Sequence, residues 1–184
     1  MMNRRQFLQL GATSTVALTA TSITATLTGC SESLPANSNY RVLRAKDREF
    51  IIAVAPVMLQ GHFPEDPIQR ETVLNSMLKN IDTAIFNLGP HNQKQFKDLL
   101  TLLNFGLSRG LTTGVWSQWK NANDDEISNF LNRWRDSGFE LFNMAYNGLN
   151  KLMAATFYGH PIGWQLARYP GPPYADTLIT KNNN

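Results

Sequence analysis

The chain has 184 residues, of which 42% are hydrophobic and 17% are charged, so its apolar content is too high for a disordered protein. Its 17 Lys and Arg against 14 Asp and Glu give a net charge of +3, which is too small for a nucleic-acid binder with a dedicated basic face. The single cysteine excludes an internal disulfide, a cysteine-rich zinc site and an iron–sulfur cluster. At this length we expect one domain with short terminal segments.

Residues 1–29 predict an export signal. They contain two adjacent arginines followed by an uncharged stretch, which is the layout of such a signal. The arginine pair, one further residue and Phe-Leu resemble the twin-arginine (Tat) signal, so the Tat translocase is an expected partner. The residues that carry this resemblance are Arg4, Arg5, Phe7 and Leu8. The alternative is a transmembrane anchor, but residues 11–28 include seven Thr and two Ser and are only mildly hydrophobic.

The only cysteine closes this stretch. Leu27-Thr28-Gly29-Cys30 resembles a bacterial lipobox, in which cleavage leaves a lipidated Cys30 as the new N-terminus. The alternative is a small-residue cleavage site with an incidental cysteine. Multiple acylation of Cys30 would make the protein a membrane-anchored periplasmic lipoprotein. Ser31 in place of Asp favours the outer membrane over the inner. Loss of residues 1–29 lowers the net charge to +1, which gives no support for steering toward nucleic acid or anionic lipid.

The mature chain reads as helical almost throughout. Residues 30–42 are expected to form the lipidated cysteine and a flexible tether, and residues 43–158 a helical domain. Asn123 and Glu126 resemble a capping box at the start of one helix. The fold class is therefore all-α, an irregular bundle of about five to six helices. They are expected at residues 46–60, 67–88 and 92–105, after Asn123, and at 139–158, with a less regular stretch at 106–120.

The last of these helices is apolar over most of its circumference. One face is formed by Phe142, Ala145, Tyr146, Leu149, Leu152 and Met153, and further apolar residues lie beyond it, among them Leu141 and Met144. Such a helix is buried on more than one side. The sequence favours a central helix of the domain. The alternative is a helix covered on one side by a partner chain.

Chemistry-bearing residues are few and scattered. His62, His91 and His160 lie far apart and belong to no metal-binding motif, and Asp82 and Asp98 are expected on solvated helix faces. No nucleotide-binding glycine motif or nucleophile motif is present. We therefore expect no catalytic, cofactor or metal site in this chain. Three tryptophans are candidates for a pocket lining, although core packing is their commoner use: Trp116, Trp119 and Trp134.

The C-terminal segment, residues 159–184, combines aromatic residues with Gly and Pro and shows no helical period. Prolines reduce the entropy cost of docking in an extended form, and exposed Trp and Tyr are favoured interface anchors. We expect an extended Pro/aromatic tail. Its alternative roles are docking on a partner and folding back over the chain's own core.

Four segments together resemble the Tat-exported small subunit of flavin-dependent dehydrogenases of the glucose–methanol–choline class. This family includes the third subunit of gluconate 2-dehydrogenase and the small subunit of bacterial glucose dehydrogenase. The segments are Arg4-Arg5-Gln6-Phe7-Leu8, Leu43-Arg44-Ala45-Lys46-Asp47-Arg48, Phe130-Leu131-Asn132-Arg133-Trp134-Arg135, and Phe157-Tyr158-Gly159-His160-Pro161 through Trp164 to Tyr169-Pro170-Gly171-Pro172-Pro173. Cys30 departs from the soluble members of this family.

The resemblance implies a helical subunit without a cofactor, bound to a larger partner that holds FAD. The expected function is that of a non-catalytic accessory subunit that supports maturation and Tat export of the flavoprotein to the periplasm. The alternatives are a stand-alone periplasmic lipoprotein that binds a small apolar ligand, and an enzyme acting alone. The residues expected to contact the partner are Trp134, Tyr158, Trp164, Tyr169, Pro170, Pro172 and Pro173.

Overall fold

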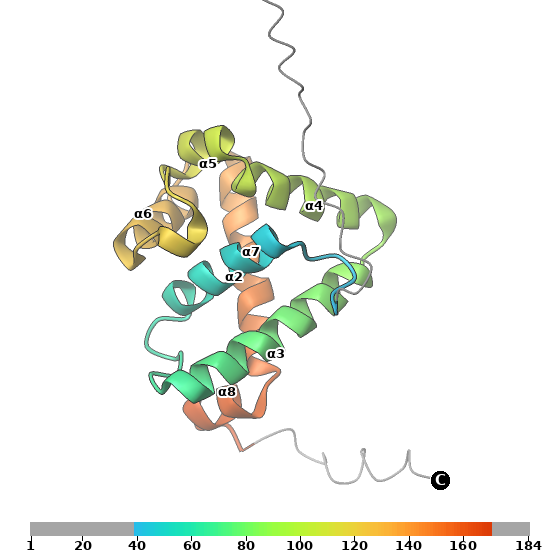
Figure 1. The fold of residues 1–184 in the computed structure, drawn as a ribbon, viewed down its shortest axis with the longest axis vertical. Helices are drawn as coiled ribbons and strands as arrows, with labels where there is room; N and C mark the ends of the chain where they lie inside the picture. The colour runs from blue at the N-terminus through green and yellow to red at the C-terminus, as the bar shows by residue number, and fades with distance from the viewer. Residues whose placement is uncertain (1–38, 171–184) are drawn as a thin grey trace, which may run out of the picture. The chain divides into compact units, whose positions relative to one another are not determined.

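The computed structural model describes residues 39–170, and within them the chain is all-α (Figure 1). This confirms the predicted fold class. The export-signal residues Arg4, Arg5, Phe7 and Leu8, the lipidation candidate Cys30, and Pro172 and Pro173 lie outside the described residues. The helices of the described part are α2 (Ala45–Met58), α3 (Pro67–Phe86), α4 (Pro90–Asn104), α5 (Gly106–Thr113), the short 3₁₀ helix η1 (Trp119–Asn121), α6 (Asp124–Arg135), α7 (Glu140–Tyr158) and α8 (Pro161–Leu166).

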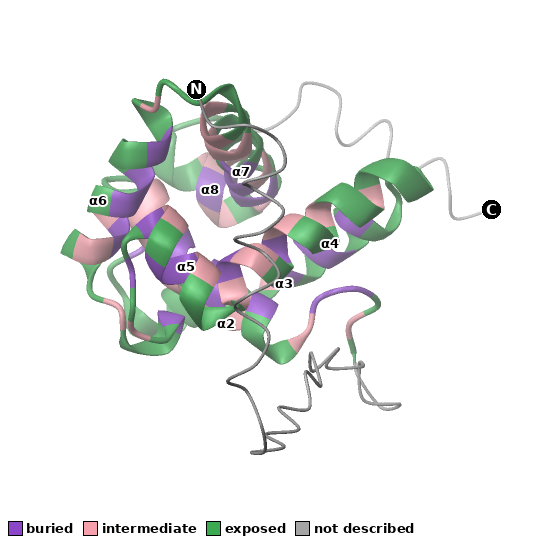
Figure 2. Ribbon diagram, turned by 90° about the horizontal axis from the view of Figure 1, so that it is seen from above, coloured by how far each residue is buried: buried purple, intermediate pink, exposed green. Residues whose placement is uncertain are grey.

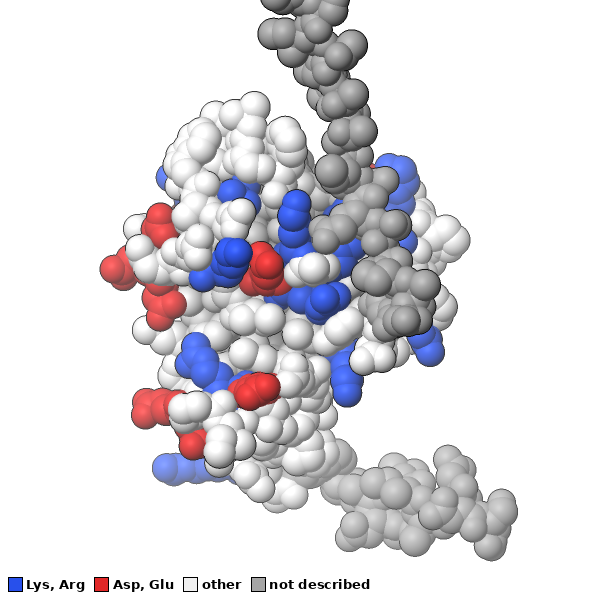
Figure 3. All heavy atoms as spheres, viewed as in Figure 1, with Lys and Arg blue, Asp and Glu red and all other residues white. Residues whose placement is uncertain are grey.

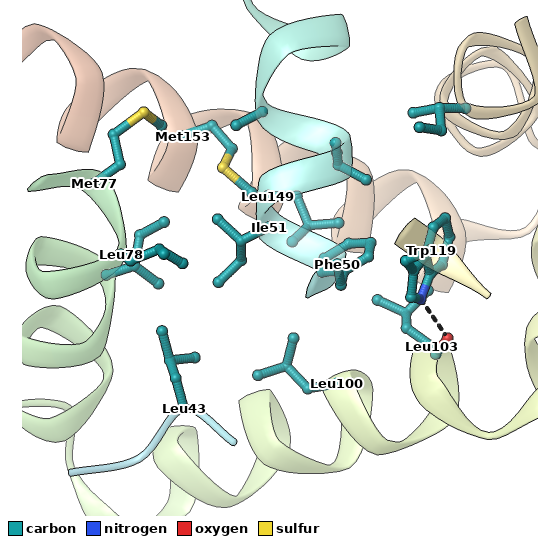
Figure 4. Packing of buried hydrophobic residues seen from close by; sticks show 14 of the residues in the cluster. Leu43, Phe50, Ile51, Met77, Leu78, Leu100, Leu103, Trp119, Leu149 and Met153 are labelled. Carbon is teal, nitrogen blue, oxygen red and sulfur yellow. Dashed lines mark hydrogen bonds between the residues drawn. The ribbon is translucent and has the colours of Figure 1, made fainter. Parts of the chain in front are cut away.

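Helix α2 lies at the centre of the bundle. It packs against α3, α4, η1, α6 and α7. Figure 1 shows it among α3, α4, α6 and α7. Its buried residues include Phe50, Ile51 and Val54, which recur at the spacing of one helix face. Figure 4 shows Phe50 and Ile51 among side chains of the neighbouring helices. Pro56 lacks a backbone N–H, and the helix ends two residues later at Met58.

The last helix, predicted as the central one, packs against α2, α3, α6 and α8 but is largely exposed in its first half. Helix α7 buries its second half, with Leu149, Met153 and Phe157 in the core. Its first half contains exposed apolar residues, among them Leu141 and Met144. Figure 2 shows buried and exposed residues alternating along the helices, so that each helix has a side directed away from the core.

The segment before α2 is hydrogen-bonded to α3. The prediction of a flexible tether over residues 30–42 is therefore wrong for its last two residues, Arg41 and Val42. Asp82 accepts hydrogen bonds from the backbone N–H groups of Arg41, Val42 and Leu43, each at 2.8 Å. Both Val42 and Asp82 are buried. Asp82 is therefore not the solvated helix residue that the sequence predicts, whereas Asp98 is exposed and pairs with Lys94.

Trp119 anchors the less regular stretch to the core. Trp119 of η1 donates its indole N–H to the carbonyl of Leu103 at 2.9 Å, and its ring contacts that of Phe50 edge-on (Figure 4). Gly114 ends α5 in the left-handed region, with φ of 81°. The next helix, α6, begins with the predicted capping box between Asn123 and Glu126, which is confirmed.

The segment predicted as an extended tail contains a helix. Pro161 occupies the first turn of α8, and the side chain of His160 accepts a hydrogen bond from the N–H of Ile162. Gly163 lies so close to the carbonyl of Phe157 that a Cβ there would overlap it. A cap, a proline at the helix start and a glycine at the contact together allow α8 to pack on the end of α7. Through residue 170 the chain therefore follows the alternative of folding back on its own core.

None of the helices described between residues 39 and 170 has the length and apolarity needed to cross a bilayer.

Candidate interaction surface

The first half of α7 presents large apolar side chains to solvent. Phe139, which precedes the helix, is 73% exposed, Leu141 is 68% exposed and Met144 is 57% exposed. A single exposed leucine is normal on a protein surface, but three such residues within six positions form a patch. This patch is consistent with the alternative left open by the sequence, in which a partner chain covers α7 on one side.

A groove lies beside this patch, between α4 and α7, with a volume of about 650 Å³. The wall contributed by α4 contains Phe96, Leu99 and Leu102, and Asn92, Gln95 and Asp98 contribute its polar atoms. The lining is otherwise apolar, with these further residues: Leu88, Trp134, Leu141, Phe142, Met144, Ala145, Gly148 and Leu149. Because Leu141 and Met144 are more than half exposed, the groove opens to solvent along the α7 side.

Trp134 lies beneath this groove and is not an exposed contact residue. Only 1% of its surface is exposed, its indole N–H donates to the carbonyl of Thr112 at 3.0 Å, and its ring stacks on Phe142 at 5.2 Å between centroids. Its prediction as a partner contact is therefore wrong as stated. Trp134 supports Phe142, which in turn lines the groove. A tryptophan with its ring packed and its N–H bonded is a typical core residue.

The other predicted contact residues within the described part gather at the α7–α8 end. Trp164 donates its indole N–H to the carbonyl of Tyr158, and the rings of Trp164 and Tyr169 meet edge-on at 6.2 Å. Tyr158, Tyr169 and Pro170 are exposed, and Trp164 is partly buried. The structure thus brings three of the predicted aromatics together, on a surface formed by residues that do not line the groove.

A second apolar patch surrounds α5 and was missed by the sequence analysis. Its large exposed side chains are Phe105, Leu107, Leu111 and Trp116. Trp116 lies against Gly110, where a Cβ would overlap the indole ring. The available signal was the spacing of Leu107 and Leu111, which places them on one side of a short helix.

The three histidines each make a different contact. His91 contacts Gln95 at 3.1 Å on α4, His160 caps α8, and the ring of His62 lies 6.5 Å from that of Tyr158. Among residues 39–170 no group of three His, Cys, Asp or Glu side chains is placed to hold a metal ion.

Comparison of the chain with protein-family models, with curated proteins and with solved structures gives no match.

Proposed function

We propose that this chain is a non-catalytic accessory subunit that binds a larger flavin-dependent dehydrogenase and supports its maturation and Tat-dependent export to the periplasm. The FAD belongs to the partner. The chain remains on the membrane through a lipidated Cys30, in the outer membrane in preference to the inner. The twin-arginine pair and the four segments that resemble the small-subunit family support this proposal.

The observation that carries the proposal is the exposed apolar surface beside the α4–α7 groove. Leu141 and Met144 of α7 line this groove, and the stacked pair Trp134 and Phe142 lines it from beneath. Protein interfaces are built around such apolar side chains on a rigid support, with polar groups at the edge. Asn92, Gln95 and Asp98 of α4 supply polar groups of this kind.

Co-purification tests the proposal. A C-terminally tagged chain isolated from its own host should bring down a larger, untagged protein whose absorbance spectrum is that of a bound flavin. The double variant Leu141→Glu/Met144→Glu should lose this protein while keeping its helical circular dichroism, because both side chains are exposed. Ile68→Glu is the matched control, since Ile68 is 77% exposed on α3 and does not line the groove. A chain that is recovered alone from its host contradicts the proposal.

Export and anchoring are tested separately. Arg4→Lys combined with Arg5→Lys should leave both this chain and its partner in the cytoplasm, because the partner travels folded and bound. Cys30→Ala should abolish labelling with a radioactive fatty acid and release the chain from the membrane fraction. Export of the flavoprotein in the double arginine variant would contradict a role for this chain in its transport.

The groove volume supports a second candidate, a stand-alone periplasmic lipoprotein that binds a small apolar ligand. A space of about 650 Å³ with a mostly apolar lining lies within the range of small-molecule sites. In that case native mass spectrometry of the purified chain should detect a bound apolar compound and no protein partner. Leu141→Glu/Met144→Glu should then release the compound.

A further inference from the structure

Arg109 of α5 is a buried cation without a charged partner. It is 7% exposed, and its Nε and Nη2 donate to the backbone carbonyls of Val115 and Trp116, each at 3.2 Å. Its guanidinium carbon lies 5.9 Å from the centre of the Trp119 ring. No ion pair within residues 39–170 includes it. Burial lowers the pKa of Arg109, because the charged form is removed from water.

Arg109 also lines a second pocket, of about 420 Å³, formed by α2, the α4–α5 junction and η1. Two lysines line it as well, Lys46 from the first turn of α2 and Lys120 from η1. Both lysines are exposed, and no ion pair of the described residues includes either. The remaining lining residues are Glu49, Asn104, Gly106, Gln118 and Trp119. The pocket therefore has three cations against one carboxylate.

The start of α5 adds to this positive character. Helix α5 begins at Gly106, in the pocket wall, and Phe105 before it provides no side-chain cap. The first N–H groups of a helix carry the positive end of its dipole. Figure 3 shows Lys and Arg side chains gathered over the region of α2 and α4, whereas most of the visible acidic side chains lie toward the left edge of that view. The low net charge of the whole chain conceals this separation of charge.

We propose that this pocket binds a small oxyanion, a phosphate or a carboxylate group, held by Arg109 from within and by Lys46 and Lys120 at the mouth. A guanidinium has five N–H donors in a planar fork, and two are used by the carbonyls of Val115 and Trp116. The others are available for the paired hydrogen bonds that oxyanions accept. This site goes beyond the proposed accessory function and uses none of the residues that line the α4–α7 groove.

Glu49 allows the direction of a change in anion affinity to be tested. Its carboxylate lies in the same wall, and no hydrogen bond or ion pair is formed by it within the described residues. If the pocket binds an anion, Glu49 opposes binding and the two lysines favour it. A merely structural role of these residues would not produce effects of opposite direction.

The experiment is a titration of the full-length chain with inorganic phosphate at ionic strength kept constant with sodium chloride, followed by ¹H–¹⁵N NMR. We expect saturable shifts of the Trp119 indole and of the amides from Gly106 to Arg109. Lys46→Gln/Lys120→Gln should weaken phosphate binding at least tenfold, and Glu49→Gln should tighten it severalfold. Lys79→Gln/Lys151→Gln is the matched control, because both lysines are exposed on other helices, and it should leave the affinity unchanged.

A parallel titration with sodium acetate identifies the group that the site prefers. Tighter binding of phosphate than of acetate assigns a phosphate ligand, and the reverse assigns a carboxylate. Absence of saturable shifts with both anions overturns the proposal. It is equally overturned if the control pair weakens binding as much as Lys46→Gln/Lys120→Gln, or if Glu49→Gln weakens it. Because these measurements use this chain alone, their outcome is independent of whether it accompanies a flavoprotein.

Discussion

The carboxylate of Asp82 in α3 accepts a hydrogen bond from the backbone N–H of Leu43 at 2.8 Å, across 39 residues of chain. The N–H groups of Val42 and Arg41 donate to the same carboxylate. Three successive backbone donors that precede α2 are thus satisfied by one side chain on another helix. Because Val42 and Leu43 are buried, water cannot replace this carboxylate without opening the core.

Asp82→Ala should therefore destabilise the domain. Two buried N–H groups lose their acceptor, and we expect the free energy of unfolding to fall by about 3 kcal/mol. Urea denaturation followed by circular dichroism measures this change. Asp98→Ala is the control, because Asp98 forms only an exposed ion pair with Lys94, and the expected loss is within about 0.5 kcal/mol. Equal losses in the two variants would show that the contact with Leu43 does not stabilise the fold.

The capping box of α6 gives a smaller and more local prediction. Asn123 Oδ1 accepts from the N–H of Glu126 at 2.9 Å, and Glu126 Oε2 accepts from the N–H of Asn123 at 3.0 Å. Asn123→Ala should lower the free energy of unfolding by about 1 kcal/mol, because one helix-start donor loses its acceptor. Asn123→Ser should restore most of the loss, since serine is an equally good cap. If Asn123→Ala lowered the free energy of unfolding no more than Asn123→Ser, this would contradict the capping role.

The capping box of α6 and the hydrogen bonds of Asp82 differ in how well the sequence predicts them. The capping box is local, since Asn123 and Glu126 are three residues apart, and the sequence predicts it correctly. The partners of Asp82 lie about 40 residues away, so no local pattern distinguishes it from the solvated Asp98. Helix α7 shows the same limit of local patterns. Apolar residues around its circumference indicate burial, but they do not identify which side of the helix the core covers. The cap and proline of α8 were present in the sequence, but six helical residues are too few to show a period.

Trp134 and Tyr169 were both predicted to contact a partner, but Trp134 lies in the core and Tyr169 lies on the surface. Trp134→Ala removes a buried ring that packs on Phe130 and Phe142, and should cost about 4 kcal/mol of unfolding free energy. Tyr169→Ala should change stability by less than about 0.5 kcal/mol, because Tyr169 is 46% exposed near the end of the described chain. Thermal unfolding of the two variants measures the difference. Similar midpoints for both would contradict the placement of Trp134 in the core.

Gly163 determines how closely α8 packs on α7. A methyl group at this position would overlap the carbonyl of Phe157, so in Gly163→Ala we expect α8 to move away while the other helices remain folded. The indole N–H of Trp164, which donates to the carbonyl of Tyr158, reports this movement. In ¹H–¹⁵N NMR its signal should shift and its hydrogen exchange should accelerate.

The matched control for this substitution is Gly148→Ala within α7. Apart from its chain neighbours and the backbone of its own helix, no heavy atom lies within 4 Å of a Cβ built at Gly148, and alanine is the better residue in a helix interior. This variant should raise the free energy of unfolding by about 0.5–1 kcal/mol and leave the Trp164 indole signal unchanged. If Gly163→Ala also left that signal in place, α8 would not depend on the close approach of Gly163 to Phe157, and the packing described for the end of α7 would be incorrect.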